Sequence, residues 1–177
     1  MLRRPILTVT TFVATMADMR TRAGRWTHDT AAVPDGMVVF LIGMSITKLW
    51  RPDRWWPTFV AMLPMLIKQR RRPELGVLGT RVLIGGSGPV LVQYWRDAES
   101  LYRYASAADA EHRSAWARFN RAARAAPDAV GVWHETFPVA ATESIYVDMP
   151  VEGLAAAVGS VPVSGRTNRA RDRLSSG

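Results

Sequence analysis

The feature that most constrains the fold is a run of apolar residues at positions 37–46 (MVVFLIGMSI). Apolar side chains occupy both sets of alternating positions, so a strand made from this run must be covered on both faces. The run is about half of the ~20 apolar residues that a membrane-spanning helix needs. We therefore predict a buried strand and a fold that places a layer of structure on each side of it.

Strand and helix signals alternate along the rest of the chain. Apolar residues recur at helical spacing over 54–72, where Pro57 suits the first turn and Pro64 predicts a kink or a break. A glycine-rich turn at 85–89 separates two predicted strands. We expect helices at 98–105 and 108–126, and strands at 75–84, 90–96, 130–137 and 144–149, the last two as an antiparallel pair.

This order of elements is typical of an α+β fold, namely a ferredoxin-like antiparallel sheet with helices on one face. The predicted strands are apolar on both faces, so the face without helices needs a cover. We expect a second copy of the chain to supply it, which gives a homodimer built sheet against sheet.

Length and charge bound the organisation of the chain. Its 177 residues suit one domain, which we place at 23–158, after an N-terminal extension at 1–22 and before a basic tail at 159–177 that we expect to be disordered. Residues 1–25 carry a net charge of +4 and residues 165–177 carry +3, out of +8 for the chain. Because the body between them is nearly neutral, we expect no nucleic-acid partner. Because the longest apolar run is too short to span a bilayer, we expect no membrane partner, and because the N-terminus is a poor secretory signal, we predict a cytoplasmic protein.

Several blocks of sequence resemble a known enzyme family. The segment 93–105 (QYWRDAESLYRYA), followed by His112 and Trp116, resembles the dimeric α/β-barrel monooxygenase superfamily. Together with the blocks at 38–44, 115–120, 131–136 and 145–150, it is similar to the fumagillin-pathway-type monooxygenase-like family, over roughly residues 23–156. The resemblance implies a ferredoxin-like protomer, a dimeric α/β barrel and an oxidative role on small organic molecules. The wider superfamily includes haem-binding proteins as well as oxygenases that use no cofactor.

The segment Trp133-His134-Glu135-Thr136 carries the strongest chemical signal. Strand alternation places His134 and Glu135 on opposite faces, so a partner for His134 must come from another strand. Tyr146 and Asp148 share one face of the last predicted strand, and we expect them beside His134 in one barrel cavity. There His134 would act as a base on an acidic phenol or enol, although a core histidine held by Asp148 or a backbone carbonyl fits the same pattern. Tyr94 and Trp95 are the next candidate site residues.

The few potential metal and cofactor ligands in the sequence limit which cofactors the protein could bind. The chain has no cysteine and three histidines, which removes thiolate metal sites, and we predict no metal and no cofactor. The alternative is haem: related haem-binding proteins carry a histidine on the helix where this chain has His112, although we favour a surface histidine on a polar helical turn. Trp50, Trp55 and Trp56 are expected to anchor the first helix, with a role at the cavity mouth or in the dimer contact as alternatives.

Three functional hypotheses remain from the sequence. The first is a small dimeric monooxygenase-like enzyme that acts on an aromatic or polyketide-like small molecule in a barrel cavity, without a cofactor. The second is a haem-binding enzyme of the aldoxime-dehydratase-like type that uses His112 or His134. The third is a non-catalytic module that binds a small organic molecule in the same cavity.

Overall fold

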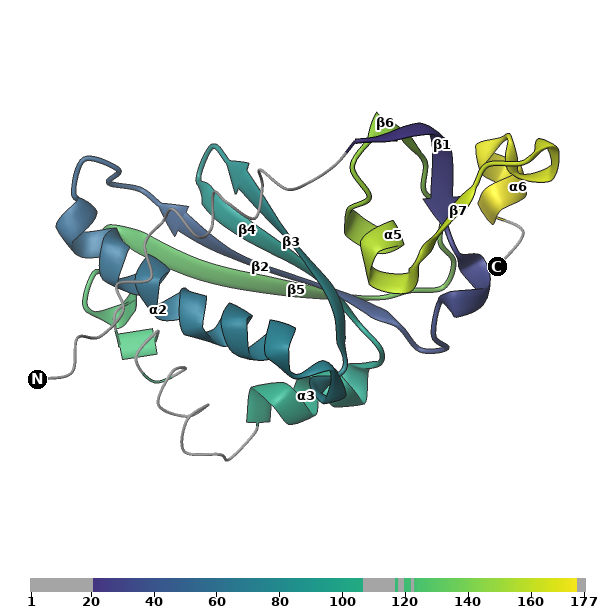
Figure 1. Cartoon of the computed structure of the whole chain (residues 1–177). Coiled ribbons are helices and arrows are strands. Elements are labelled where there is room, and N and C mark those ends of the chain that lie inside the picture. Colours follow the sequence, from purple (N-terminus) through teal and green to yellow (C-terminus); the bar gives the residue numbers. More distant parts are fainter. Residues whose placement is uncertain (1–20, 107–116, 118–119, 122, 175–177) are drawn as a thin grey trace, which may run out of the picture.

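The main sheet has four antiparallel strands in the order β3-β4-β2-β5. The computed structural model describes residues 21–106, 117, 120–121 and 123–174. The strands are β2 (Val38–Ile46), β3 (Val77–Gly85), β4 (Gly88–Trp95) and β5 (Val130–Pro138). Helix α2 (Pro52–Arg71) joins β2 to β3, and α3 (Ala98–Ser106) follows β4. This connectivity confirms the predicted α+β, ferredoxin-like fold (Figure 1). The predicted helix at 108–126 lies largely outside the described residues.

Helix α2 runs unbroken through both of its prolines. Pro57 and Pro64 both lie on exposed positions, where water can satisfy the carbonyl groups that a proline leaves without a helical donor. The break that Pro64 predicted therefore does not occur.

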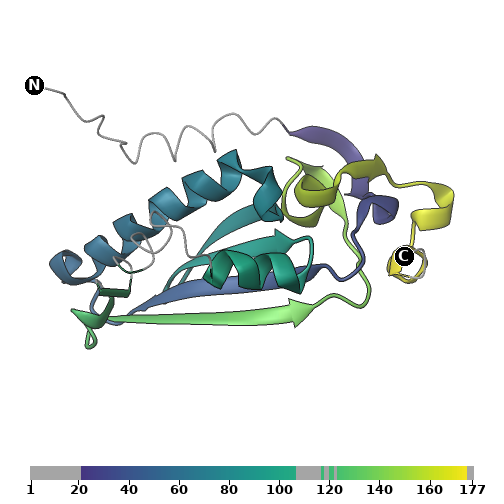
Figure 2. The same ribbon diagram turned by 90° about the horizontal axis from the view of Figure 1, so that it is seen from below.

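The core of the described chain lies between the main sheet and helices α2 and α3. Helices α2 and α3 lie on the same side of the sheet, which Figure 2 shows from below. Three clusters of buried side chains fill this layer, centred on Trp95, Met44 and Leu91. The alternate side chains of β2 point into it, because Phe40 and Ile42 pack against the same clusters.

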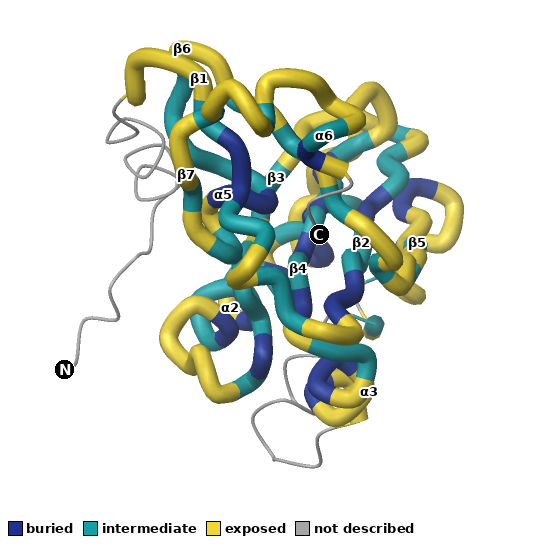
Figure 3. The backbone as a smooth tube through the Cα atoms, turned by 90° about the vertical axis from the view of Figure 1, so that its right-hand side faces the viewer, coloured by how far each residue is buried: buried dark blue, intermediate teal, exposed yellow. Residues whose placement is uncertain are grey.

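A second sheet of three strands lies on the other side of the main sheet. Its order is β6-β1-β7, with β1 (Arg22–His28), β6 (Tyr146–Met149) and β7 (Ser160–Pro162). Helix α5 (Gly153–Val158) packs against β3, where Ala157 lies over Gly79. Figure 3 shows α2 and α3 below the main sheet and α5 with β1 and β7 above it.

The predicted pairing of 130–137 with 144–149 was wrong. Strand β5 pairs along its whole length with β2, from Val38↔Pro138 to Ile46↔Val130. Strand β6 pairs instead with β1, which sequence reasoning did not recognise as a strand. The connection over 139–145 carries the chain from one sheet to the other, so β5 and β6 are neighbours in sequence only.

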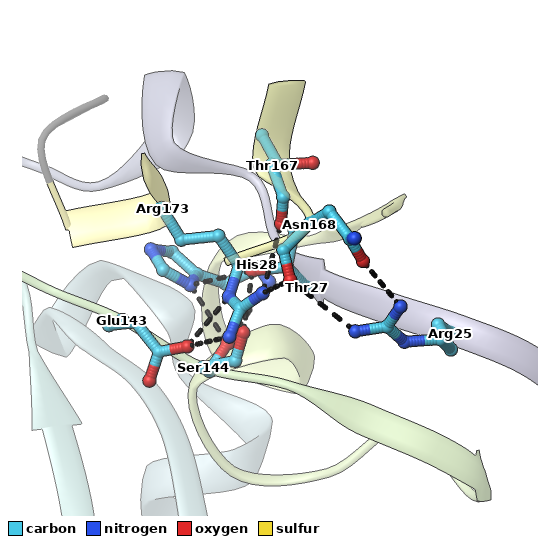
Figure 4. A network of polar contacts seen from close by, with 8 residues as sticks. All are labelled: Arg25, Thr27, His28, Glu143, Ser144, Thr167, Asn168 and Arg173. Atoms are coloured by element: carbon cyan, nitrogen blue, oxygen red, sulfur yellow. Dashed lines mark hydrogen bonds and ion pairs between the residues drawn. The ribbon is translucent and has the colours of Figure 1, made fainter. Parts of the chain in front are cut away.

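The predicted disorder after residue 159 was also wrong for residues 160–174. Strand β7 pairs with β1, and the chain continues through a 3₁₀ turn η3 (Gly165–Thr167) into α6 (Ala170–Leu174). Arg173 is only 5% exposed; its guanidinium forms an ion pair with Glu143 and donates to the carbonyl oxygens of Thr167 and Asn168. Figure 4 shows this network around His28. Polar contacts hold the segment in place of the apolar side chains that it lacks.

Candidate functional site

A partly open cavity of about 60 Å³ lies between the main sheet and its helices. Its walls are predominantly apolar, as small-molecule sites usually are. The sheet contributes Phe40, Ile42, Leu91, Gln93 and Trp95; α2 contributes Met62, Met65, Leu66 and Gln69; and α3 with the residue at its end contributes Leu101, Tyr104 and Ala105.

Two buried glutamines and a tryptophan give this apolar cavity a polar wall. The Gln93 Nε2 atom donates to Gln69 Oε1 at 2.7 Å, and Trp95 Nε1 donates to Gln93 Oε1 at 3.2 Å. The three side chains are 6% exposed or less, so their polar groups depend on one another for hydrogen bonds. This arrangement can orient a bound molecule through its oxygen or nitrogen atoms while the apolar walls exclude water.

Sequence reasoning missed both glutamines, although the pattern contains them. Gln93 alternates with Leu91 and Trp95 on the buried face of β4. Gln69 follows Thr58, Met62 and Met65 on the buried face of α2. A polar side chain in the middle of an otherwise apolar face is the signal that identifies such a position.

Of the predicted site residues, Trp95 and His134 lie on the cavity side of the sheet. Trp95 is fully buried and lines the cavity. His134 pairs with Ile42 across the β2–β5 ladder and is exposed, and its ring lies 5.6 Å from the ring of Phe40, which lines the cavity. His134 is therefore at the rim of the cavity.

Tyr94 lies on the opposite face of β4 from Trp95, as strand alternation requires. There the hydroxyls of Tyr94 and of Tyr146 in β6 both lie near Gly153: a Cβ atom built on Gly153 would be 3.5 Å from the first and 3.3 Å from the second. Burial raises the pKa of the Tyr94 phenol, Tyr146 and Glu152 raise it further, and Arg81 lowers it. Tyr94 is thus held as a neutral hydroxyl at neutral pH, which suits hydrogen-bond donation and not proton abstraction.

The remaining groups of this second cluster are structural. Arg81 donates to Glu152 at 2.7 Å, and the backbone N–H of Ala155 donates to the Tyr146 hydroxyl at 3.3 Å. The first contact joins β3 to the residue before α5, and the second joins α5 to β6 of the second sheet. Because Tyr146 lies in the second sheet, beyond the face opposite the cavity, the predicted grouping of Tyr146 with His134 does not form.

Asp148 is also separated from His134. Its Oδ1 accepts a hydrogen bond from the backbone N–H of Gly24 at 2.8 Å, where the pairing of β1 with β6 is irregular. Its own backbone has a positive φ of 48°, a conformation that aspartate tolerates better than most residues. The observed contact of Asp148 is therefore within the second sheet.

The predicted haem ligand His112 lies outside the described residues. Within the described part of the chain, no group of three or more histidine, aspartate or glutamate side chains could hold a metal ion. In that same part, no helix has both the length and the apolar character needed to cross a bilayer.

Comparison with known proteins identifies related sequences and folds. The family model for monooxygenase af470-like proteins matches residues 37–154, which run from the start of β2 into α5. No curated protein matches the chain.

Solved structures similar to this chain include three bacterial proteins. SnoaB from Streptomyces nogalater, described as a cofactor-independent oxygenase, has 14% sequence identity and a TM-score of 0.39; the match covers 60% of this chain and 96% of SnoaB. A putative antibiotic biosynthesis monooxygenase from Caulobacter crescentus CB15 has 12% identity and a TM-score of 0.41, with coverage of 59% and 91%. MupZ from Pseudomonas fluorescens has 16% identity and a TM-score of 0.38, with coverage of 60% and 74%.

Proposed function

This chain belongs to the monooxygenase af470-like family, and from that premise we propose that it is a monooxygenase-like enzyme that acts on a small organic molecule in the cavity between the main sheet and α2 and α3. The observation that carries the proposal is the cavity itself, with its apolar walls and its Gln69–Gln93–Trp95 hydrogen bonds. An aromatic or polyketide-like molecule fits this chemistry, because its rings match the walls and its oxygen atoms match the amides.

The cavity is smaller than the 300–1,000 Å³ or so typical of drug-sized ligands. Its α2 wall is made partly of Met62 and Met65. Methionine is unbranched and rotates readily, so these side chains can move apart to admit a planar molecule. We expect binding to enlarge the cavity on the α2 side, because the opposite wall is a fully paired sheet.

The proposed chemistry needs no added cofactor. A substrate with an acidic carbon–hydrogen bond beside a phenol or enol loses a proton to His134, and the resulting carbanion reacts with molecular oxygen to give a hydroperoxide. Loss of water from the hydroperoxide leaves a carbonyl group, so a CH₂ group and O₂ become C=O and H₂O, with the substrate as the source of electrons. His134 at the rim takes the proton, while Gln93 and Trp95 orient the ring system within the cavity.

An oxygen-uptake assay with an anthrone, which carries such a CH₂ group, tests the proposal. We expect uptake by the full chain without any added cofactor, a loss of at least tenfold in His134→Ala, and a normal rate in Tyr146→Phe, because Tyr146 lies beyond the other face of the sheet. Unchanged uptake in His134→Ala would contradict the role of His134. Dependence of uptake on added haem would favour the haem hypothesis.

We further propose that a second copy covers the remaining open face of the main sheet. Trp133 and Phe137 of β5 lie on that face with Leu41 of β2, and Phe137 is 49% exposed. Light scattering that finds a stable monomer at micromolar concentration would contradict the homodimer. The cytoplasmic location stays a prediction from the sequence.

A further inference from the structure

The outward face of α2 is apolar, which is unusual for a helix on the surface of a domain. Its inward face consists of Thr58, Met62, Met65 and Gln69, all buried. The exposed positions at the start of α2 and just before it form what we call the apolar stripe: Leu49, Trp50, Trp56, Pro57, Val60 and Pro64. Trp50 is 74% exposed and Leu49 is 67% exposed. Burying such side chains against another surface would stabilise that contact.

Trp55, which is not part of the apolar stripe, anchors the start of α2 without the stripe. Trp55 packs on the buried cluster around Met44, and its Nε1 donates to the carbonyl of Leu49 at 3.1 Å. Trp56 stacks on Phe59 with ring centroids 5.5 Å apart, so it is held in place while its outer surface stays in water. The anchoring role predicted for the tryptophan cluster therefore belongs to Trp55, which leaves Trp50 and Trp56 for contact with something else.

Positive charge flanks the stripe at both ends. Residues 48–72 contain seven lysines and arginines and one acid, a local net charge of +6 that acidic residues elsewhere between 26 and 164 offset. The basic residues are Lys48, Arg51 and Arg54 at the start, and Lys68, Arg70, Arg71 and Arg72 at the end. Residues 55–67 carry no charge. Two of the starting charges are paired locally, Lys48 with Asp128 and Arg51 with Asp53, and Arg70 and Arg71 are exposed.

An apolar centre with cationic ends matches the chemistry of an anionic bilayer surface. A helix of 20 residues is about 30 Å long, so it can place the stripe among acyl chains and its ends among headgroups. A nucleic acid would favour cations interleaved with aromatics along one groove, whereas here the centre of the helix is uncharged. Two copies packed stripe to stripe would bring two segments of charge +6 together, which electrostatic repulsion opposes.

We propose that α2 is a peripheral membrane-binding helix that lies with its apolar stripe in the interface of an anionic lipid bilayer. The expectation of no membrane partner concerned spanning segments, which this mode of binding does not require. The inward face of α2 lines the cavity, so an apolar molecule dissolved in the bilayer would meet the protein beside that cavity. The proposal stands on α2 alone and does not depend on the proposed enzyme activity.

Vesicle sedimentation of the full chain tests this proposal. We expect binding to phosphatidylcholine vesicles that contain about one third phosphatidylglycerol, weak binding to phosphatidylcholine alone, and a fall in binding between about 50 and 500 mM salt. Val60→Asp should weaken binding at least about tenfold, because it places a charge in the apolar stripe. Val147→Asp is the matched control: the same substitution at a side chain of similar exposure in the second sheet, 50% against 40%.

A second variant keeps the test decisive if Val60→Asp destabilises α2. Leu49→Asp changes an exposed residue before the helix and should weaken binding in the same way. The proposal is overturned if the full chain binds neither kind of vesicle, or if Val147→Asp weakens binding as much as the two stripe variants. It is also overturned if the stripe variants leave vesicle binding intact and instead dissociate a dimer or abolish binding to single-stranded DNA.

Discussion

The hydrogen-bonded glutamine pair in the cavity predicts an unusual mutational pattern. Gln93→Leu removes the acceptor of the Trp95 N–H and the donor to Gln69 Oε1. Both partners are then buried without a hydrogen bond, and each costs about 1–3 kcal/mol, so we expect a loss of roughly 4 kcal/mol in the free energy of unfolding. Leucine has nearly the same volume as glutamine, so a cavity term adds little.

Substitution of the second glutamine, Gln69, completes a double-mutant cycle with Gln93. Gln69→Leu leaves only the amide nitrogen of Gln93 without its partner, for a loss of roughly 2 kcal/mol. The double variant Gln69→Leu/Gln93→Leu leaves only the Trp95 N–H, again roughly 2 kcal/mol. The double variant should thus be more stable than Gln93→Leu alone by about 2 kcal/mol, although it carries one more substitution.

Equilibrium unfolding in urea, followed by far-UV circular dichroism, measures the three losses. Leu91→Met is the control: it also lines the cavity, makes no side-chain hydrogen bond and should cost less than about 1.5 kcal/mol. The reasoning fails if the double variant loses the sum of the two single losses, because the glutamines would then not share one network. A stable double variant that no longer binds the substrate would show that the amides serve ligand binding.

Three further predictions concern other parts of the fold. Burial lowers the pKa of His28, although Glu143 and Asp29 oppose this shift, so the unfolded chain binds a proton at this histidine at a higher pH than the folded chain does. The thermal stability should therefore fall as the pH drops from about 7 to 5. Thermal unfolding of His28→Gln should show a weaker fall. Glu143→Gln removes the counter-charge of buried Arg173, so we expect it to lower the free energy of unfolding by roughly 2 kcal/mol and to expose the chain after residue 159 to proteolysis. The control Asp53→Asn changes an exposed ion pair and should leave the unfolding midpoint unchanged. Gly43→Val would place a Cβ atom 2.5 Å from the Trp133 ring and should cost about 1–3 kcal/mol in urea unfolding, while Gly165→Val, which has open space, should be neutral.

The sequence predicts the main sheet well because its signals are local. Strands β2 and β4 are predominantly apolar, the glycines at 85–88 form their expected hairpin, and α2 and α3 show helical spacing. The chain's own alternation also predicted correctly that His134 and Trp133 face opposite ways. Each of these features is decided within a few neighbouring residues, by side-chain period and turn chemistry.

The second sheet could not be predicted in the same way, because its contacts join distant residues. Strand β1 (RAGRWTH) has no apolar alternation, and the Arg22 guanidinium lies over the ring of Trp26 in the same strand. Residues 160–174 are polar and show no periodic pattern, yet Arg173 becomes buried against Glu143. The free energy that orders these segments comes from backbone pairing across more than 100 positions and from an ion pair between residues 30 positions apart, and no local sequence pattern indicates either contact.

The position of this second sheet constrains how two copies can meet. The family match covers residues 37–154, so β1, β7 and α6 lie outside the region that identifies the family. In this chain α5 packs on β3 and contacts β4, and the hydroxyls of Tyr94 and Tyr146 both lie beside Gly153 at the start of α5. Part of the open face of the main sheet is therefore already covered within one chain, while Phe137 of β5 remains half exposed. A dimer that buries the rest must be centred on β2 and β5, so Phe137→Asp should dissociate it, whereas a charge on the outward face of α2 should not.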